Sequence, residues 1–569
     1  MNRFYKFKLP FIMTAMALLL CLLCGVATAE EPKTWYVDAN LGSDTEGLGS
    51  QESPYQTIQK AIAVASDGDI IFVKAGTYAI PSTIQINKAL TLRGPNHDKN
   101  PTQGGQREAE AVLDGGSTNR FLRIRASNVT IEGFTITSSG KTAIWQNGAD
   151  AVDGLVIRNN IFDGNSEAFA TSVAAAGNPN TLNNLHFVNN LIVNNTSRSF
   201  SHYTGVMGTN FTIEGNEIRE SLCGFHLGNV DGVTIANNHI TLGDNYWAIL
   251  LAGTTCDNVV IADNILDGQN TAGVGISVWY EKVDLGKVTV ENNTIKNFKK
   301  AGINIRQNEG DVVDASQWTV TRNTIMNNDI GILHEGTGTL NAANNWWGHA
   351  TGPTSERNPG GQGDAVEGDV NFLPWYVDEA MTQLSTTEID CVDSGDTELE
   401  FVNSGVTMEI ETDEKEGYVS VTRYSYDDRS APEGMIPAGI YLRIERSDNL
   451  AGAPVRMEIS YDPDELTEGV AEDDLRLYRY NPEKEQWELI TSQGIDKDKK
   501  ILWAKLDEFS EFGIFAAAPE EPVVEEPEEE EPGGDTPRTS GGLLYSFLLG
   551  LFLVLAGFLL IRKEGVQGR

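Results

Sequence analysis

The sequence of 569 residues predicts an all-β protein: a right-handed parallel β-helix, then an antiparallel β-sandwich, an acidic linker and a C-terminal transmembrane helix. Three observations lead to this prediction. An asparagine frame recurs every 22 to 30 residues through the middle of the chain. Short alternating apolar runs without a repeated frame follow it, and an uncharged apolar stretch lies near the C-terminus. The predicted parts are a signal peptide at 1–29, the β-helix with an N-terminal cap at 30–380, the sandwich at 385–518, the linker at 519–541, the transmembrane helix at 542–561 and a cytoplasmic tail at 562–569.

The asparagine frame places an apolar residue three positions before an Asn and another two positions after it, as Ile157 and Phe162 flank Asn160. A variable period around a constant core predicts a solenoid whose insertions lie in loops. We expect the Asn to take the left-handed backbone region at a bend, and its buried amide to bond to the next Asn. The leucine-rich repeat is disfavoured because its Leu frame is missing. The eight predicted ladder residues are Asn160, Asn190, Asn216, Asn238, Asn264, Asn293, Asn323 and Asn345.

Both ends of the array carry motifs of their own. Trp35-Tyr-Val-Asp38 leads into a segment from about Thr57 to Ala65, which we expect to form a helix that caps the open end. This entry resembles that of pectin-lyase-like β-helix proteins. Asn344-Asn-Trp-Trp-Gly348 and Phe372-Leu-Pro-Trp375 are similar to the closing segment of bacterial and archaeal surface β-helix proteins. The resemblance covers residues 34–378 and implies a prokaryotic, C-terminally anchored surface protein. It does not specify a function, because this fold hosts lyases, hydrolases, epimerases, adhesins and inert scaffolds.

The region 385–518 has about nine short alternating runs, such as Leu399–Val402 and Val455–Tyr461, separated by turn residues. Short strands at close spacing without a repeated frame predict an antiparallel β-sandwich. It resembles the membrane-proximal sandwich of prokaryotic surface proteins. It carries no recognisable catalytic constellation, so we interpret it as a stalk.

The N-terminus has the pattern of a secretory signal peptide. Three cations in the first eight residues precede an apolar run from Phe11 to Leu23, and Ala27-Thr-Ala29 offers a small-x-small cleavage site. A lipoprotein anchored at Cys24 is the alternative, disfavoured because Leu-Leu precedes it. This pattern predicts export from the cell.

The C-terminus has the pattern of a membrane anchor. The linker has eight Glu between Glu520 and Glu531, and the stretch from Leu543 to Ile561 carries no charge. Such a stretch can span a bilayer, and the Arg and Lys after it predict a cytoplasmic tail. Residues 536–540 depart at both ends from a cell-wall sorting signal, so wall attachment is the minority alternative. We expect a cell-surface protein, whose oligomeric state the sequence does not indicate.

Composition excludes some partners. The formal charge of −39 disfavours nucleic acid, since phosphate binding needs Lys and Arg. Three cysteines remain after the signal peptide (Cys223, Cys256 and Cys391), and we expect buried thiols rather than a disulfide framework. No cofactor is indicated, although Asp38 and Asp44 are weak candidates for binding Ca²⁺.

In β-helix enzymes the active site usually lies on the outer face of one sheet, here the strands that open with a small residue. Alternation assigns two outward columns to these strands. A lyase needs a base and carboxylates for Ca²⁺, and a glycosidase needs two carboxylates about 5–9.5 Å apart. Glu335, beside Arg306, is the one acidic group in these columns, and His226 has no titratable neighbour in them. These three residues are the weak catalytic candidates. The alternative for Glu335 and Arg306 is a surface salt bridge, and the alternative for His226 is a polar surface residue. The first column reads Trp145, Ala174, Met207, His226, Leu250, Ser277, Asn304 and Leu333, and the second reads Asn147, Ala176, Thr209, Gly228, Ala252, Trp279, Arg306 and Glu335.

The same face predicts carbohydrate binding, because flat aromatic rings stack on sugars and amides or guanidinium groups bind hydroxyls. Ordinary loop packing is the alternative. We therefore expect a surface protein that binds a polysaccharide or matrix glycan without catalysis; the alternative is a cell-attached lyase or hydrolase acting on acidic polysaccharide. The candidate residues are Trp279, Tyr280, Asn304, Arg306, Trp145 and Trp247. Further groups could come from the expected loops Asp163–Thr171, Asn194–Tyr203, Glu281–Lys287 and Glu309–Gln317.

Overall fold

The computed structural model describes residues 31–518, except 105, 148–149, 173–180, 204, 244–245, 272, 279–283, 307–312 and 414–416. Residues up to Ala518 belong to one compact unit. The predicted signal peptide, linker, transmembrane helix and tail lie outside the described residues. Within the described ranges, no helix is long and apolar enough to cross a membrane.

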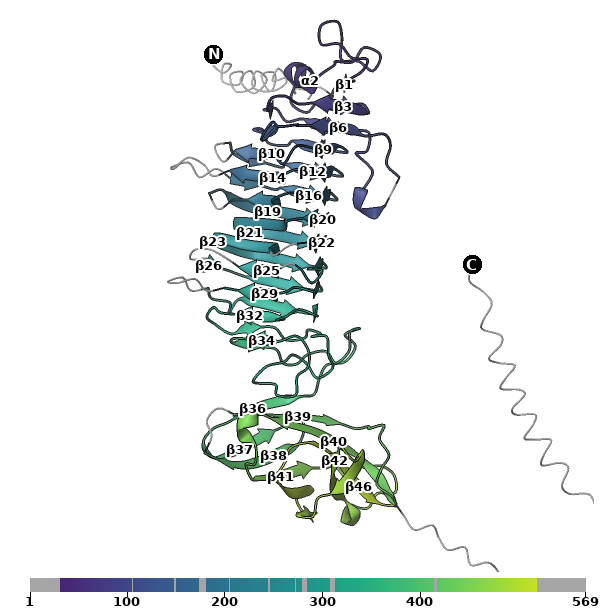
Figure 1. Cartoon of the computed structure of the whole chain (residues 1–569), viewed down its shortest axis with the longest axis vertical. Helices are drawn as coiled ribbons and strands as arrows, with labels where there is room; N and C mark the ends of the chain where they lie inside the picture. The colour runs from purple at the N-terminus through teal and green to yellow at the C-terminus, as the bar shows by residue number, and fades with distance from the viewer. Residues whose placement is uncertain are drawn as a thin grey trace, which may run out of the picture. The chain divides into compact units, whose positions relative to one another are not determined.

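A parallel β-helix forms the first part of the chain, as predicted from the asparagine frame (Figure 1). Each coil gives one strand to a ten-stranded sheet and further strands to a 25-stranded sheet. The ten strands are β3 (Gly76–Ala79), β6 (Ala111–Asp114), β9 (Thr135–Thr137), β13 (Ile161–Asp163), β17 (Leu191–Val193), β20 (Glu217–Ser221), β22 (His239–Leu242), β24 (Ile265–Asp267), β28 (Thr294–Lys296) and β31 (Thr324–Met326).

The larger sheet follows the coils through the whole array, and its strands pair in parallel from one coil to the next. Its strands are β1 (Thr34–Val37), β2 (Ile70–Val73), β4 (Ile84–Ile86), β5 (Thr91–Arg93), β7 (Leu122–Ile124), β8 (Thr130–Glu132), β10 (Thr142–Asn147), β11 (Val152–Asp153), β12 (Val156–Arg158), β14 (Glu167–Ser172), β15 (Thr181–Asn183), β16 (His186–Val188), β18 (Arg198–His202), β19 (Met207–Glu214), β21 (Cys223–Ala236), β23 (Trp247–Ala262), β25 (Val274–Val278), β26 (Asp284–Leu285), β27 (Val288–Glu291), β29 (Ala301–Ile305), β30 (Trp318–Thr321), β32 (Ile332–His334), β33 (Leu340–Asn341), β34 (Val366–Glu367) and β35 (Val370–Asn371).

The asparagine column joins consecutive coils inside the stack. The Oδ1 atom of Asn238 accepts hydrogen bonds from the backbone N (3.0 Å) and the Nδ2 (2.9 Å) of Asn216. Its own Nδ2 donates to the carbonyl of Ile213 and to Oδ1 of Asn264, both at 2.9 Å. These groups are buried, so the ladder satisfies polar atoms that water cannot reach.

The bend itself differs from the expectation. The ladder asparagines do not take the left-handed region; the residue before each of them does, as Asn159 (φ 57°), Asn237 (φ 54°) and Asn292 (φ 55°) show. Asn is common at this position because its short polar side chain tolerates positive φ. The sequence suggested that one asparagine both makes the bend and forms the ladder. In the structure the residue before the ladder asparagine makes the bend, and the ladder asparagine makes the hydrogen bonds.

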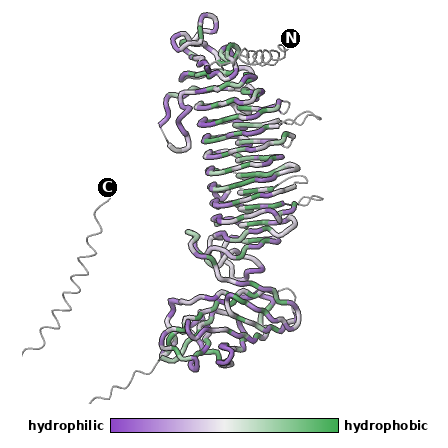
Figure 2. Tube along the Cα trace, turned by 180° about the vertical axis from the view of Figure 1, so that it is seen from behind, coloured by the Kyte–Doolittle hydropathy of each residue, from purple (hydrophilic) through white to green (hydrophobic). Residues whose placement is uncertain are grey.

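Apolar side chains fill the interior. Hydrophobic residues recur from coil to coil along the trace (Figure 2). Phe169 and Phe200 have ring centroids 5.2 Å apart, and Phe200 packs edge-on against Phe225. The N-terminal end carries α2 (Ile58–Val64), whose Ile58, Ala61 and Ile62 are buried. Repeated aromatic contacts of this kind fix the register between coils as well as burying surface.

Two antiparallel sheets follow the β-helix, as the sequence predicted, and their inner residues share one core. The six-stranded sheet holds β36 (Glu388–Val392), β39 (Gly417–Tyr424), β40 (Met435–Arg446), β42 (Arg476–Asn481), β43 (Gln486–Leu489) and β46 (Glu511–Ala517). The five-stranded sheet holds β37 (Gly395–Phe401), β38 (Val406–Thr412), β41 (Val455–Ser460), β44 (Gln493–Asp496) and β45 (Ile501–Leu506). Short 3-10 turns occur at η1 (Pro101–Gln103), η2 (Asp448–Leu450) and η3 (Glu472–Asp474).

Cysteines make no cross-links among the residues described. Cys223 and Cys256 are buried free thiols, and Cys391 is partly exposed. Burial raises the pKa of both Cys223 and Cys256 to about 12. The two thiols therefore stay protonated and act as small apolar residues of the stack.

Candidate functional site

The strand register defines the outer face that the sequence could only approximate. One outward column is Trp145, Ala170, Ser201, His226, Leu250, Ser277, Asn304 and Leu333, each paired with the next. Ala170 and Ser201 thus replace the expected Ala174 and Met207. In the second column Ser172 replaces Ala176, and Thr209 lies on another strand, opposite Asp231.

The outward columns were assigned wrongly because two strands were mistaken for loops. Residues 163–171 and 194–203 were expected to be loops, yet they contain β14 and β18. In these coils the small residue that opens the strand is Ala168 or Ser199 rather than Gly. Both strands could have been identified from a small residue followed by phenylalanine: Ala168-Phe169 in β14 and Ser199-Phe200 in β18.

The corrected register brings four polar side chains together on β14, β18 and β21, namely Glu167, Arg198, Tyr203 and His226 (the Glu167–His226 cluster). The Tyr203 hydroxyl donates to Oε1 of Glu167 at 3.1 Å and accepts from Nη1 of Arg198 at 3.1 Å. The other carboxylate oxygen of Glu167 accepts from the Thr142 hydroxyl at 2.8 Å. The His226 ring packs edge-on against Tyr203, with centroids 5.7 Å apart. Of the four, only His226 was named from the sequence.

Burial sets the protonation states in the cluster. It lowers the pKa of His226 to about 3, with the Arg198 charge acting in the same direction, so the imidazole is neutral at physiological pH. Burial also raises the pKa of Tyr203, and the Glu167 carboxylate adds to the shift. His226 was a weak catalytic candidate, with a polar surface residue as the alternative. The residue is only 7% exposed.

Some polar atoms of the outward column are buried without partners among the described residues. Nδ1 of His226 makes no hydrogen bond, and neither does Oδ1 or Nδ2 of Asn304. Asn304 is fully buried although it faces away from the core. Unsatisfied buried amides are costly, so native proteins retain few of them. These atoms are therefore candidate ligand contacts.

Tryptophans lie on either side of the cluster along the axis. Trp145 is on β10, before the cluster, with the guanidinium groups of Arg120 and Arg123 at 4.8 and 5.0 Å from its ring centre. Trp247 is on β23, after the cluster, and packs against the partly exposed Tyr246 at 5.6 Å. Both tryptophans come from the predicted set and frame the same face.

The remaining sequence candidates fall into two groups. Trp279 and Tyr280 lie outside the described residues. Arg306 and Glu335 occupy adjacent coils, since the Glu335 backbone N donates to the Ile305 carbonyl at 2.9 Å. Glu335 is exposed and Arg306 half-buried, at the end of the strands. This pair is away from the Glu167–His226 cluster, which lies three or more coils earlier in the stack.

The two calcium candidates, Asp38 and Asp44, accept hydrogen bonds from nearby residues. Oδ1 of Asp38 accepts from the backbone N of Asn40 and of Leu41, both at 3.0 Å. Asp44 binds the backbone N and the hydroxyl of Thr57, the N-cap of α2. Throughout the described part of the chain, no three His, Cys, Asp or Glu side chains form a group that could hold a metal ion.

Comparisons with known proteins agree with the fold. The family model described as "Right handed beta helix region" matches residues 187–313. No curated protein matches the chain in sequence. The chain therefore contains a right-handed parallel β-helix, as its sequence suggested.

Solved structures match the chain at low identity and low TM-score. The pectate lyase Pel9A is 13% identical, with 60% of this chain and 79% of that chain covered and a TM-score of 0.32. The GH136 lacto-N-biosidase from Eubacterium ramulus is 10% identical (64% and 70% covered, TM-score 0.35), and the Dettilon tailspike protein is 11% identical (81% and 89% covered, TM-score 0.32). Similarities of this size are confined to the fold, so the function has to follow from the side chains of this chain.

Proposed function

We propose that the protein binds a polysaccharide along the outer face of β10 to β29, without catalysis. The observation that supports this most strongly is the Glu167–His226 cluster, in which arginine, tyrosine, histidine and a carboxylate meet on one outward face. Such groups bind sugar hydroxyls and carboxylates. Arg198 donates to the Tyr203 hydroxyl through Nη1 and supplies the positive charge of the cluster.

The geometry also suggests how a glycan would lie. Neighbouring coils are about 4.8 Å apart, so the column from Trp145 to Asn304 presents one side chain per coil in a straight line. A polysaccharide strand parallel to the axis would meet Trp145, the cluster and Trp247 in turn. The aromatic rings would stack on sugar faces.

Protonation states favour binding over catalysis. A general base works best with a pKa near the operating pH. His226, with a pKa of about 3, is a weak base, and Tyr203 has a raised pKa and stays protonated. Glycoside hydrolysis needs two carboxyl groups, and Glu167 is the one carboxylate within the described contacts of the cluster.

A second candidate function is a polysaccharide lyase, which one observation favours: Arg198, Tyr203 and His226 adjoin one another. In β-elimination from a uronate, Arg198 would pair with the carboxylate while a base removes the C5 proton. The C4–O bond would then break, and Tyr203 would protonate the leaving oxygen. Formation of the unsaturated product, measured by its ultraviolet absorbance on pectate or alginate with and without Ca²⁺, decides between the two functions.

The location of the protein is part of the proposal. The signal-peptide pattern at 1–29 and the apolar stretch at 542–561 suggest a protein exported to the cell surface and held by a C-terminal membrane anchor. Protease treatment of intact cells tests this: the β-helix should be cleaved from the surface while the C-terminal tail is protected. Release of the whole protein into the medium would contradict it.

Affinity electrophoresis through gels containing pectate, alginate or host-type glycans tests the binding function. The full-length protein should be retarded by at least one polysaccharide, and Arg198→Ala should remove most of the retardation. Arg125→Ala is the matched control, since Arg125 is an exposed arginine that pairs with Asp150 away from the cluster. Equal retardation of the two variants would contradict the assignment of the site.

A further inference from the structure

The outer face of the six-stranded sheet is polar and aromatic, whereas its inner face is apolar. Val421 and Leu442 point into the sandwich core, so the residues next to them, Thr422 and Arg443, point away from it. The outward residues pair across β39 and β40 as Ser420 with Glu445, Thr422 with Arg443, and Tyr424 with Tyr441. This region was interpreted from its sequence as a plain stalk.

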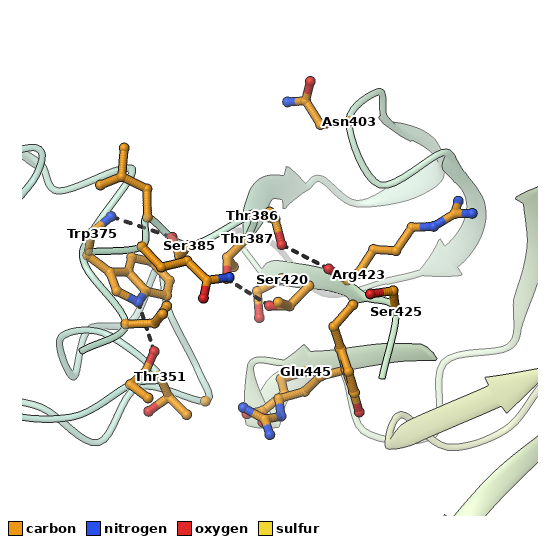
Figure 3. A pocket seen from close by; sticks show the side chains of 18 of the residues that line it. Thr351, Trp375, Ser385, Thr386, Thr387, Asn403, Ser420, Arg423, Ser425 and Glu445 are labelled. Atoms are coloured by element: carbon orange, nitrogen blue, oxygen red, sulfur yellow. Dashed lines mark hydrogen bonds between the residues drawn. The ribbon is translucent and has the colours of Figure 1, made fainter. Parts of the chain in front are cut away.

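A cleft of about 760 Å³ lies on this face. Its volume falls within the roughly 300–1,000 Å³ of ordinary ligand sites. Residues of the last β-helix turns, among them Thr351 and Trp375, complete its wall (Figure 3). The side chains along it are unusually rich in hydroxyl groups: Ser385, Thr386, Thr387, Ser420, Thr422 and Ser425.

The positive charges at the cleft are already engaged. Nε of Arg443 binds Oε1 of Glu511 at 2.9 Å. Nη1 of Arg423 donates to the carbonyls of Ser404 (2.9 Å) and Ser460 (3.1 Å). Glu445 lines the cleft as well, and burial raises its pKa. An anionic ligand would therefore meet carboxyl groups without an available cation, which disfavours it.

Tyr424 supplies an aromatic surface. It lines this cleft and also an adjoining hollow of about 440 Å³ that contains Tyr426. Its ring stacks on Tyr441 with centroids 5.6 Å apart. Its hydroxyl is buried and faces Asp427, whose pKa it lowers. Burial raises its pKa to about 12, so the group stays a neutral donor.

We propose that this cleft binds a neutral oligosaccharide, as a second carbohydrate site independent of the one on the β-helix. Hydroxyl side chains both donate and accept hydrogen bonds, as sugar hydroxyls do, so the two sets can pair without buried charge. The Glu445 carboxyl adds a fixed partner, and the Tyr424 ring offers an apolar surface for a sugar ring. The sandwich would then be a binding module as well as a spacer.

Titration calorimetry on the full-length protein tests this with three neutral probes: cellohexaose, mannohexaose and maltohexaose. At least one should bind. Ser425→Trp should abolish that binding, because Ser425 is an exposed residue of the cleft wall and the indole would fill the space. Tyr424→Ala should weaken it about tenfold, because the aromatic surface for a sugar ring is lost.

Two controls separate this site from the β-helix site. Ser492→Trp places the same bulk at an exposed position that does not line the cleft, and it should bind like the unmodified protein. Tyr203→Phe, in the β-helix, should also leave neutral hexasaccharide binding unchanged. The proposal is overturned if none of the three probes binds, if Ser425→Trp binds normally, or if Tyr203→Phe abolishes the binding.

Discussion

Removal of one ladder asparagine should destabilise the β-helix far more than removal of an exposed one. In Asn238→Ala, the buried backbone N of Asn216 loses its acceptor, and the Ile213 and Ala236 carbonyls lose a donor. An unsatisfied buried group costs about 1–3 kcal/mol. We therefore expect the free energy of unfolding to fall by about 3–5 kcal/mol, a large share of the roughly 5–15 kcal/mol of an ordinary domain.

Urea denaturation of the full-length protein, followed by circular dichroism, measures this loss as a shift of the midpoint. Asn371→Ala is the matched control, because Asn371 is an exposed asparagine on β35 of the same β-helix and should change stability by less than about 0.5 kcal/mol. Asn238→Leu fills the volume without the hydrogen bonds and should not rescue stability. If Asn238→Leu matches the unmodified protein, or if the two Ala variants shift the midpoint equally, the hydrogen-bonded ladder is not what stabilises the coils.

Three further predictions concern acid–base behaviour and chemistry. Burial raises the pKa of Asp364 to about 6, so the stability of the protein should fall as pH rises from about 4 to 6. In urea denaturation at pH 7, Asp364→Asn should be more stable than the unmodified protein by on the order of 1–3 kcal/mol. At pH 4 the two proteins should be equally stable. The pKa of His226 is lowered to about 3 in the folded state, so as pH drops below 6.5 the unfolded state binds a proton and the folded state does not. Stability should therefore fall below pH 6.5. His226→Gln should make that fall shallower in thermal unfolding. Incubation with pectate and alginate should give no unsaturated product; steady turnover that Tyr203→Phe abolishes would establish the lyase instead.

The sequence was sufficient to predict the β-helix because the asparagine frame is repeated. The apolar residues around Asn160 and Asn238 recur in every coil, so the frame can be recognised even where one repeat departs from it. Bends were harder, because Asn at two adjacent positions, as in Asn159 and Asn160, hides which one has the left-handed backbone. The structure divides the roles: the first makes the turn and the second makes the ladder.

The candidate site was only partly predictable. Trp145, His226, Trp247 and Asn304 were identified because their strands could be found from the sequence. Glu167, Arg198 and Tyr203 were missed because β14 and β18 were mistaken for loops. Contacts among these residues join three coils, and no local pattern encodes them. They follow only from the pairing of strands that are far apart in sequence.

The central claim is that the Glu167–His226 cluster binds polysaccharide on the outer face of the β-helix. The most direct measurement is the affinity of the full-length protein and of Tyr203→Phe for the same purified polysaccharide, with product formation followed in the same samples. Tyr203→Phe removes one hydroxyl that contacts Glu167 and Arg198, and it keeps the ring against His226. The account predicts binding that weakens about tenfold in the variant, with no product from either protein. Equal affinity of the two proteins, or no binding by the unmodified chain, would contradict it.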